Sequence, residues 1–117
     1  GVMSEPNATV VVGATRKELR VQLKDADGVP LNLPSATARI QGKSRELTGT
    51  PIDVAGSLYD AGNGVFRWVG VGSWIDSVDL GSIPHADYTL RVRFVDNAGL
   101  VDFSPELVIR FERDPLS

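Results

Sequence analysis

One stretch of the sequence, LKDADGVPLNL, carries the spacing that most resembles a chemical site. Its two aspartates lie one residue apart and precede a glycine: Asp25, Asp27 and Gly28. An EF-hand calcium loop begins in this way, but it needs further oxygen ligands at alternate positions and a bidentate glutamate at the twelfth. Counting from Asp25, the fifth position is Val29 and the twelfth is Ala36. The EF-hand pattern therefore fails.

A structural turn explains the same residues. Aspartate bonds readily to its own backbone, and glycine accepts the left-handed conformation that β-branched residues avoid. We predict that Asp25, Asp27 and Gly28 form the turn of a β-hairpin, with positive φ at Gly28. The alternative is a weak calcium site that this turn shares with another loop.

Catalytic patterns are absent from the sequence. The single histidine, His85, lies near Asp87, but no nucleophile elbow accompanies the pair. Zinc sites use several histidine or cysteine ligands, and the chain has one histidine and no cysteine. The glycine pairs in GNG and VGVG lack the lysine of a phosphate-binding loop. The sequence predicts no catalytic residue, no metal site and no cofactor, so the protein is not expected to be an enzyme.

Four arginines form a second pattern. Each alternates with apolar residues along an expected strand, which turns it away from the core: Arg39, Arg91, Arg93 and Arg110. In an immunoglobulin-like order, the third strand and the last two share a sheet, so these arginines would share one exposed face with Glu112. That face is either a solvated surface with cross-strand pairs or a docking surface, because arginine is enriched at interfaces.

Aromatic residues offer a third possibility, a platform for stacking sugars, for which the candidates are Trp68, Trp74, Tyr59 and Tyr88. Trp68 and Tyr88 fall on the apolar faces of their strands, so we assign both to the core. Trp74 lies in a loop between glycines and acids, and it is the candidate exposed aromatic. The alternative is that Trp74 closes one end of the fold.

The elements that must position these residues are short strands with period-two alternation, separated by the turn sequences DADG, DAGNG and DNAG. The segment SWIDSVDLG allows one short helical turn with Ser73 as its cap. The pattern predicts an all-β, antiparallel, immunoglobulin-like β-sandwich of about seven to eight strands, with a small closed barrel as the alternative. The expected strands are residues 8–12, 18–24, 36–41, 65–69, 88–95 and 106–112.

Composition sets the remaining limits. The 117 residues suit one domain, which we place at 9–112 with flexible termini at 1–8 and 113–117. The net charge of −3 argues against nucleic acid as the main partner. No apolar run approaches the roughly 20 residues that a membrane span needs, so no membrane association is expected.

The ordered set LKDADGVPLNL, ATARIQ, PIDVAGSLYDAGNGVFRWV, YTLRVRFVD and PELVIRFE resembles the N-terminal domain of the phage baseplate upper protein family. The resemblance covers roughly residues 9–112. The positions that carry it are turn and core residues: Asp25, Asp27, Gly28, Pro30, Leu33, Gly64, Val65, Trp68, Tyr88 and Pro105.

The resemblance implies a β-sandwich that attaches a tail-tip protein to the rest of a virion or tail-like particle. The partners would be other tail or baseplate-like proteins, including a second copy of this chain. The expected location is the virion or tail-like particle, with the protein cytoplasmic before assembly. The alternative is a carbohydrate-binding or adhesin module of a secreted or cell-surface protein.

Overall fold

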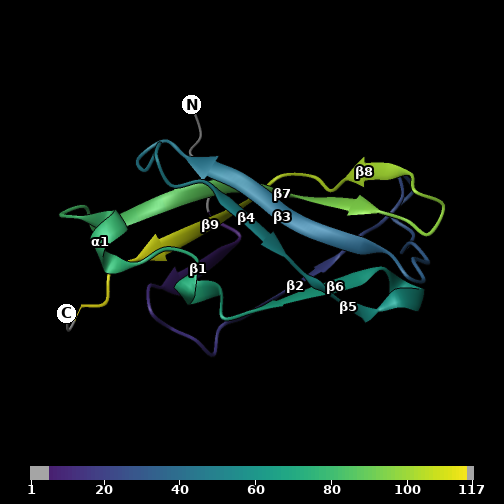
Figure 1. The fold of residues 1–117 in the computed structure, drawn as a ribbon, viewed down its shortest axis with the longest axis horizontal. Helices are drawn as coiled ribbons and strands as arrows, with labels where there is room; N and C mark the ends of the chain where they lie inside the picture. Colours follow the sequence, from purple (N-terminus) through teal and green to yellow (C-terminus); the bar gives the residue numbers. More distant parts are fainter. Residues whose placement is uncertain (1–5, 116–117) are drawn as a thin grey trace.

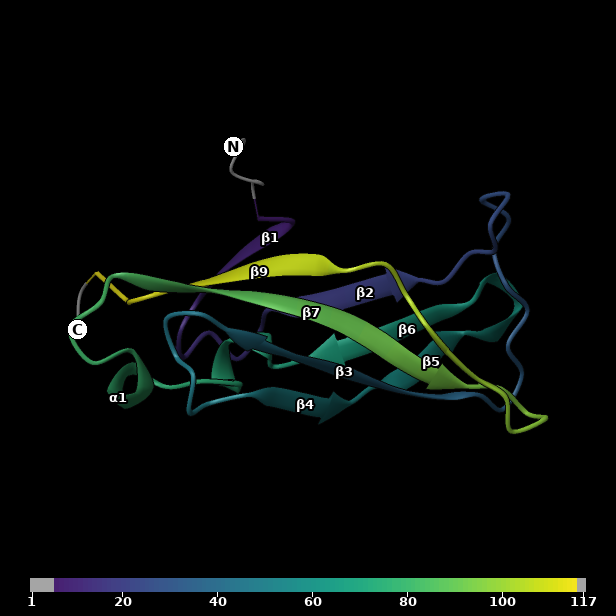
Figure 2. The same cartoon turned by 90° about the horizontal axis from the view of Figure 1, so that it is seen from above.

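Two β-sheets pack face to face in the computed structural model, which describes residues 6–115 (Figure 1). The larger sheet has the order β1-β9-β7-β3-β4 (Figure 2), and β8 pairs with the last residues of β7 (Figure 1). The smaller sheet has the order β2-β6-β5. The strands are β1 (Ala8–Val11), β2 (Glu18–Gln22), β3 (Thr37–Ser44), β4 (Ile52–Ala55), β5 (Ser57–Asp60), β6 (Val65–Val69), β7 (His85–Val95), β8 (Val101–Phe103) and β9 (Leu107–Glu112).

This strand order is immunoglobulin-like. The smaller sheet corresponds to strands B, E and D, and β9-β7-β3-β4 corresponds to G, F, C and C′. The β-sandwich prediction is confirmed, and the two separate sheets exclude the closed barrel. One detail differs from the antiparallel expectation, because β1 runs parallel to β9. Asn7, the residue before β1, ties the start of this strand to β9: its Oδ1 accepts from the Val108 N–H at 2.7 Å.

The core lies between the two sheets and follows the predicted alternation. Along β7, Tyr88, Leu90 and Val92 are buried while Thr89 and Arg91 are exposed. Trp68 and Tyr88 are both in the core, as predicted. The largest fully buried side chains come from both sheets and the loop after β6: Trp68, Tyr88, Phe66, Phe111, Ile40, Leu90, Ile109, Val71 and Val92.

The DADG segment forms a tight turn. Gly28 has φ 79°, in the left-handed region, and its N–H donates to the Asp25 carbonyl at 3.0 Å. The Asp25 carboxylate accepts from the backbone N–H groups of Asp27 and Val29 at 2.9 and 3.0 Å. The Asp25 carboxylate therefore holds the backbone of its own turn.

The same turn recurs between β7 and β8. Gly99 has φ 85°, and the Asp96 carboxylate accepts from the N–H groups of Ala98 and Leu100, both at 2.9 Å. The sequences DADGV and DNAGL therefore fold alike, because each places aspartate first and glycine fourth. Both turns lie at the same end of the sandwich (Figure 1).

A short helix, α1 (Ser77–Leu80), follows β6, as the sequence predicts. Its cap differs from the prediction. Asp76 is the N-cap, and its carboxylate exchanges backbone hydrogen bonds with Asp79 at 2.9 Å each. Ser73 instead ends the 3₁₀ turn η2 (Val71–Ser73), where its Oγ donates to the Gly70 carbonyl at 2.7 Å. Ser73 also precedes an acid by three residues, but its hydroxyl bonds Gly70, and the reciprocal capping box forms between Asp76 and Asp79 instead.

Replacing Gly28 by valine should lower the free energy of unfolding by about 1–3 kcal/mol, measured in thermal melts. No atom lies within 4 Å of a β-carbon built at this position, so the cost arises from the positive φ alone. Gly28→Asn is the matched control, because asparagine tolerates the left-handed region, and it should cost less. Millimolar calcium should not change either melt; a calcium-dependent rise would restore the ion-site hypothesis.

Candidate functional site

The outer face of the larger sheet carries all four predicted arginines. Arg39 comes from β3, Arg91 and Arg93 from β7, and Arg110 from β9. Because β3, β7 and β9 are adjacent, alternation places the four side chains on one face. Arg39 and Arg93 occupy directly opposite positions in the β3–β7 pairing. The structure therefore brings the predicted set together, but their surroundings differ.

Arg110 is neutralised within the sheet. Its Nε and Nη2 donate to the two carboxylate oxygens of Asp87 at 2.7 and 3.0 Å. Asp87 lies directly opposite Arg110 in the β7–β9 pairing. The hydrogen bond from Arg110 lowers the pKa of Asp87, and the same bond raises the pKa of Arg110. A bidentate pair of this kind leaves little charge for a partner.

Arg39 and Arg93 share one carboxylate. Arg39 Nε donates to Asp53 Oδ1 at 2.7 Å, and the same oxygen accepts from the Gln41 amide at 3.3 Å. The pKa of Asp53 is lowered chiefly by the Arg39 hydrogen bond, and the positive charge of Arg93 adds to this effect. Two guanidinium groups thus face a single acid. An excess positive charge remains here, because the Arg93 side chain has no hydrogen bond or ion pair of its own within residues 6–115.

Arg91 lies over an aromatic ring. Its guanidinium carbon is 4.1 Å from the centre of the Phe103 ring, which is 41 % exposed. Phe103 is positioned by β8, and the chain after it is held by Ser104, whose Oγ accepts from the Val92 N–H at 2.8 Å. We define the arginine face as Arg39, Arg91, Arg93 and Phe103, since Arg110 is already paired.

A groove adjoins the arginine face. An open hollow of about 880 Å³ lies between the β3–β4 loop and the ends of β7 and β9. A smaller hollow of about 210 Å³ continues from it to Arg91 and shares Lys43, Thr89 and Glu106 with it. Both signs of charge line the larger hollow, with Lys43 and Arg45 against Glu46, Asp87 and Glu106.

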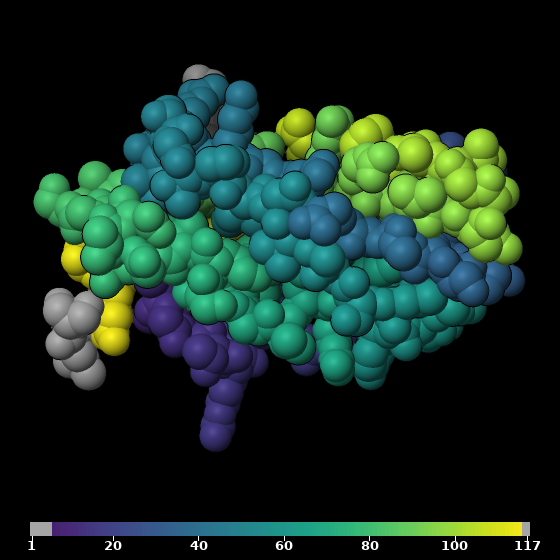
Figure 3. All heavy atoms as spheres, viewed as in Figure 1, coloured from purple at the N-terminus to yellow at the C-terminus, as the bar shows by residue number. Residues whose placement is uncertain are grey.

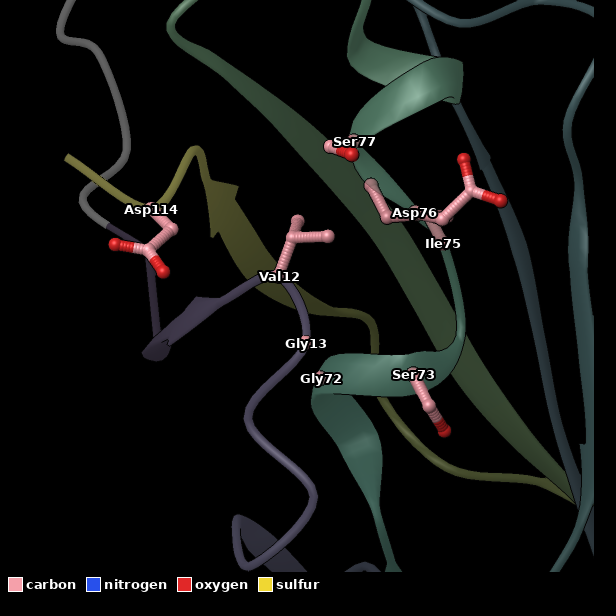
Figure 4. A pocket seen from close by; sticks show the side chains of 8 residues that line it. All are labelled: Val12, Gly13, Gly72, Ser73, Ile75, Asp76, Ser77 and Asp114. Atoms are coloured by element: carbon pink, nitrogen blue, oxygen red, sulfur yellow. The ribbon is translucent and has the colours of Figure 1, made fainter. Parts of the chain in front are cut away.

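A separate cavity lies beside β1, where the chain after β1 meets the loop after β6 (Figure 4). It has a volume of about 310 Å³. Its polar side chains include Asp76, whose carboxylate caps α1, and Ser73, which bonds Gly70. These two groups serve the local backbone. The residues that line it are Val12, Gly13, Gly72, Ser73, Ile75, Asp76, Ser77 and Asp114.

Trp74 does not form an open platform. Its side chain is half-buried, packs against the core, and lies 6.4 Å from the Phe111 ring between ring centres. The structure therefore favours the alternative in which Trp74 closes one end of the sandwich. The exposed aromatic rings are those of Tyr59 and Phe103. Tyr59 is one of the aromatic residues considered for a sugar platform, whereas Phe103 was missed from the sequence because its exposure depends on strand pairing.

His85 lies half-buried at the start of β7, opposite Glu112. The nearby carboxylate of Asp87 forms an ion pair with Arg110. Within residues 6–115, no three histidine, cysteine or acidic side chains come close enough together to hold a metal ion. No helix in the same range is long and apolar enough to cross a membrane.

No protein-family model matches this sequence, and no curated protein matches it either. Solved structures do match. The N-terminal domain of phage TP901-1 ORF48 aligns with 95 % of this chain and 91 % of its own length, at a TM-score of 0.50 and 14 % sequence identity. The two domains share a fold. ORF48 is the baseplate upper protein of that phage, so the resemblance predicted from turn and core residues is confirmed at the level of the fold.

Proposed function

We propose that this domain is a non-enzymatic attachment module of a phage tail or prophage-derived particle. The observation that carries the proposal is the fold shared with the N-terminal domain of phage TP901-1 ORF48 over 95 % of the chain. Its partners are other tail or baseplate-like proteins, and its location is the assembled particle. The carbohydrate-binding alternative is less favoured, because its candidate exposed aromatic, Trp74, packs against the core, and Tyr59 alone of the four aromatic residues considered for a sugar platform is exposed.

The arginine face is the docking surface in this proposal. Like charges directly opposite each other destabilise a sheet, so Arg39 beside Arg93 is costly in the free domain. A carboxylate from a partner would relieve this repulsion. Phe103 beside them supplies apolar contact area, and complementary charge speeds the encounter. The preferred partner surface is therefore acidic with an apolar group at its centre.

Reversing two charges tests this surface. The double variant Arg91→Glu, Arg93→Glu should fold normally, because exposed pairs contribute about 0–1 kcal/mol to folding. Its incorporation into tail particles of the source strain, measured by co-sedimentation of the tagged protein, should fall about tenfold or more, which corresponds to about 1.4 kcal/mol of lost binding.

The matched control is Arg16→Glu, Lys17→Glu, which makes the same charge change in an exposed loop away from the arginine face. The control should incorporate normally. Normal incorporation of the folded Arg91, Arg93 variant would mean that these arginines are only solvated and that docking uses another surface.

A further inference from the structure

The outer face of the smaller sheet carries a second pair of opposed arginines. Arg20 on β2 lies directly opposite Arg67 on β6. Their guanidinium carbons lie 4.1 and 5.4 Å from the centre of the Tyr59 ring on β5. Glu18 Oε1 is the only acidic partner of either arginine in the described part of the chain, at 3.0 Å from Arg20 Nε and 3.5 Å from Arg67 Nε.

This arrangement leaves excess positive charge on the outer face of the smaller sheet. Two like charges face each other, one carboxylate is shared between them, and one positive charge remains. Tyr59 is 49 % exposed and Val69, opposite Glu18, is 66 % exposed. Tyrosine and arginine beside exposed apolar groups are the composition of interface hot spots. We define the tyrosine face as Glu18, Arg20, Tyr59, Arg67 and Val69.

One end of the sandwich carries excess negative charge, opposite in sign to the charge on the outer face of the smaller sheet. Three connections meet there: the β2–β3 loop, the β5–β6 turn and the β7–β8 turn (Figure 3). Backbone hydrogen bonds tie the first two together, from Leu33 N–H to the Ala61 carbonyl at 2.8 Å. Lys24 is the one base in these connections and their flanking residues, against five acids. We define the acidic end as Asp25, Asp27, Asp60, Asp96 and Asp102 with Val29 and Leu100.

Apolar side chains project from the acidic end as well. Val29 and Leu100 each follow the glycine of one of the two equivalent turns, and they are 55 % and 69 % exposed. The acidic end therefore combines carboxylates with two apolar side chains. The tyrosine face combines excess positive charge with Tyr59 and Val69. The two surfaces are opposite in charge, and each offers apolar side chains to the other.

We propose that the tyrosine face of one copy binds the acidic end of a second copy. The proposal concerns a different sheet from the arginine face and does not rest on the proposed function. The arginine face is the poorer receptor for this end, because the Asp53 carboxylate already lies on it, at 2.7 Å from Arg39. Since the two surfaces differ, the contact is head-to-tail, and its repetition gives a ring or an open chain.

Sedimentation velocity tests the contact on the intact chain. The weight-average mass should rise above the 12.6 kDa of one chain as concentration increases. The range of about 0.01 to 1 mM covers weak interfaces. The rise should shrink at high salt, because exposed charges are screened. A chain that stays monomeric over this range at low salt would overturn the proposal.

Two variants then identify the surfaces. The face variant, Arg20→Glu with Arg67→Glu, keeps the acidic end; the end variant, Asp27→Lys with Leu100→Lys, keeps the tyrosine face. Each alone should remain at 12.6 kDa, whereas a 1:1 mixture should reach at least twice that mass. Only a head-to-tail contact predicts this result. Self-association of either variant at the wild-type level, or a mixture that stays monomeric, would overturn the proposal.

Two controls complete the design. The variant Arg16→Glu, Lys17→Glu makes the same charge change as the face variant and should associate like the wild type. The variant Arg91→Glu, Arg93→Glu should also associate normally, so failure here and failure of the proposed function remain distinguishable. If circular dichroism shows that the face variant is unfolded, Arg20→Gln with Arg67→Gln removes the charges without adding new ones and should give the same loss.

Discussion

Replacing Trp68 by alanine should lower the free energy of unfolding by about 3–5 kcal/mol, the cost of deleting a large aromatic side chain from a core. Trp68 is 2 % exposed and lies between the two sheets beside Phe66, with ring centres 6.4 Å apart. Its indole Nε1 donates to the Val54 carbonyl at 2.9 Å. The variant therefore loses buried area and leaves a backbone acceptor without its donor. A loss of this size would remove a large share of the 5–15 kcal/mol typical of a domain.

Gly56 provides an internal check on this interpretation. A β-carbon at position 56 would lie 2.5 Å from the Trp68 ring. Gly56→Ala should therefore destabilise the wild type, and it should cost much less in the Trp68→Ala background, where the ring is gone. Urea unfolding of the two single variants and the double variant measures this coupling. A Trp68→Ala protein that unfolds at nearly the wild-type midpoint, or strictly additive costs, would contradict the packing seen here.

Local alternation was sufficient to predict the buried side of the strands that it identified, but not the core residues of the loop after β6, such as Val71. Phe66 and Trp68 alternate with Arg67, and Leu90 and Val92 alternate with Arg91, so each strand specifies its own buried side. Turn positions were predictable for the same reason, since aspartate and glycine act through their own backbone. These features need only the residues of a single segment.

Contacts between strands were not predictable from any one segment. Asp53 neutralises Arg39 only because β4 pairs with β3, and Asp87 neutralises Arg110 only because β7 pairs with β9. Alternation turned Arg67 outward, but it could not show that Arg20 would lie opposite. The charge left over on each face is a property of the pairing. For that reason the sequence indicated four equivalent arginines where the structure separates one from the rest.

Phe103 was missed for a related reason. Strand β8 has three residues and lies next to Pro105, so the segment shows too little alternation to be recognised as a strand. Its position depends on β7 and on the hydrogen bonds of Ser104 to Val92. The apolar group of the arginine face, Phe103, therefore comes from a strand that forms only by pairing with β7.

Tyr88 carries the second large effect, which appears at alkaline pH. The phenol is fully buried, and its oxygen donates to the Thr50 carbonyl at 2.6 Å. Burial raises the pKa of Tyr88 to about 12, and the negative charges of Asp79 and Glu46 contribute in the same direction. The ordinary pKa in the unfolded chain is about 10. The folded domain therefore holds this proton more tightly than the unfolded chain does.

The sign of the pH dependence follows from that difference. The stabilisation from neutral Tyr88 is fully present below about pH 10 and is lost as the pH rises toward 12, by up to about 2–3 kcal/mol. Tyr88→Phe should cost about 1 kcal/mol at neutral pH through the lost hydrogen bond, but it cannot titrate. Urea unfolding of both proteins at a series of alkaline pH values should therefore show the stability of the wild type falling faster than that of the variant. If the free energy of unfolding fell equally in the two proteins as the pH rises, the pKa of Tyr88 would not be raised by folding.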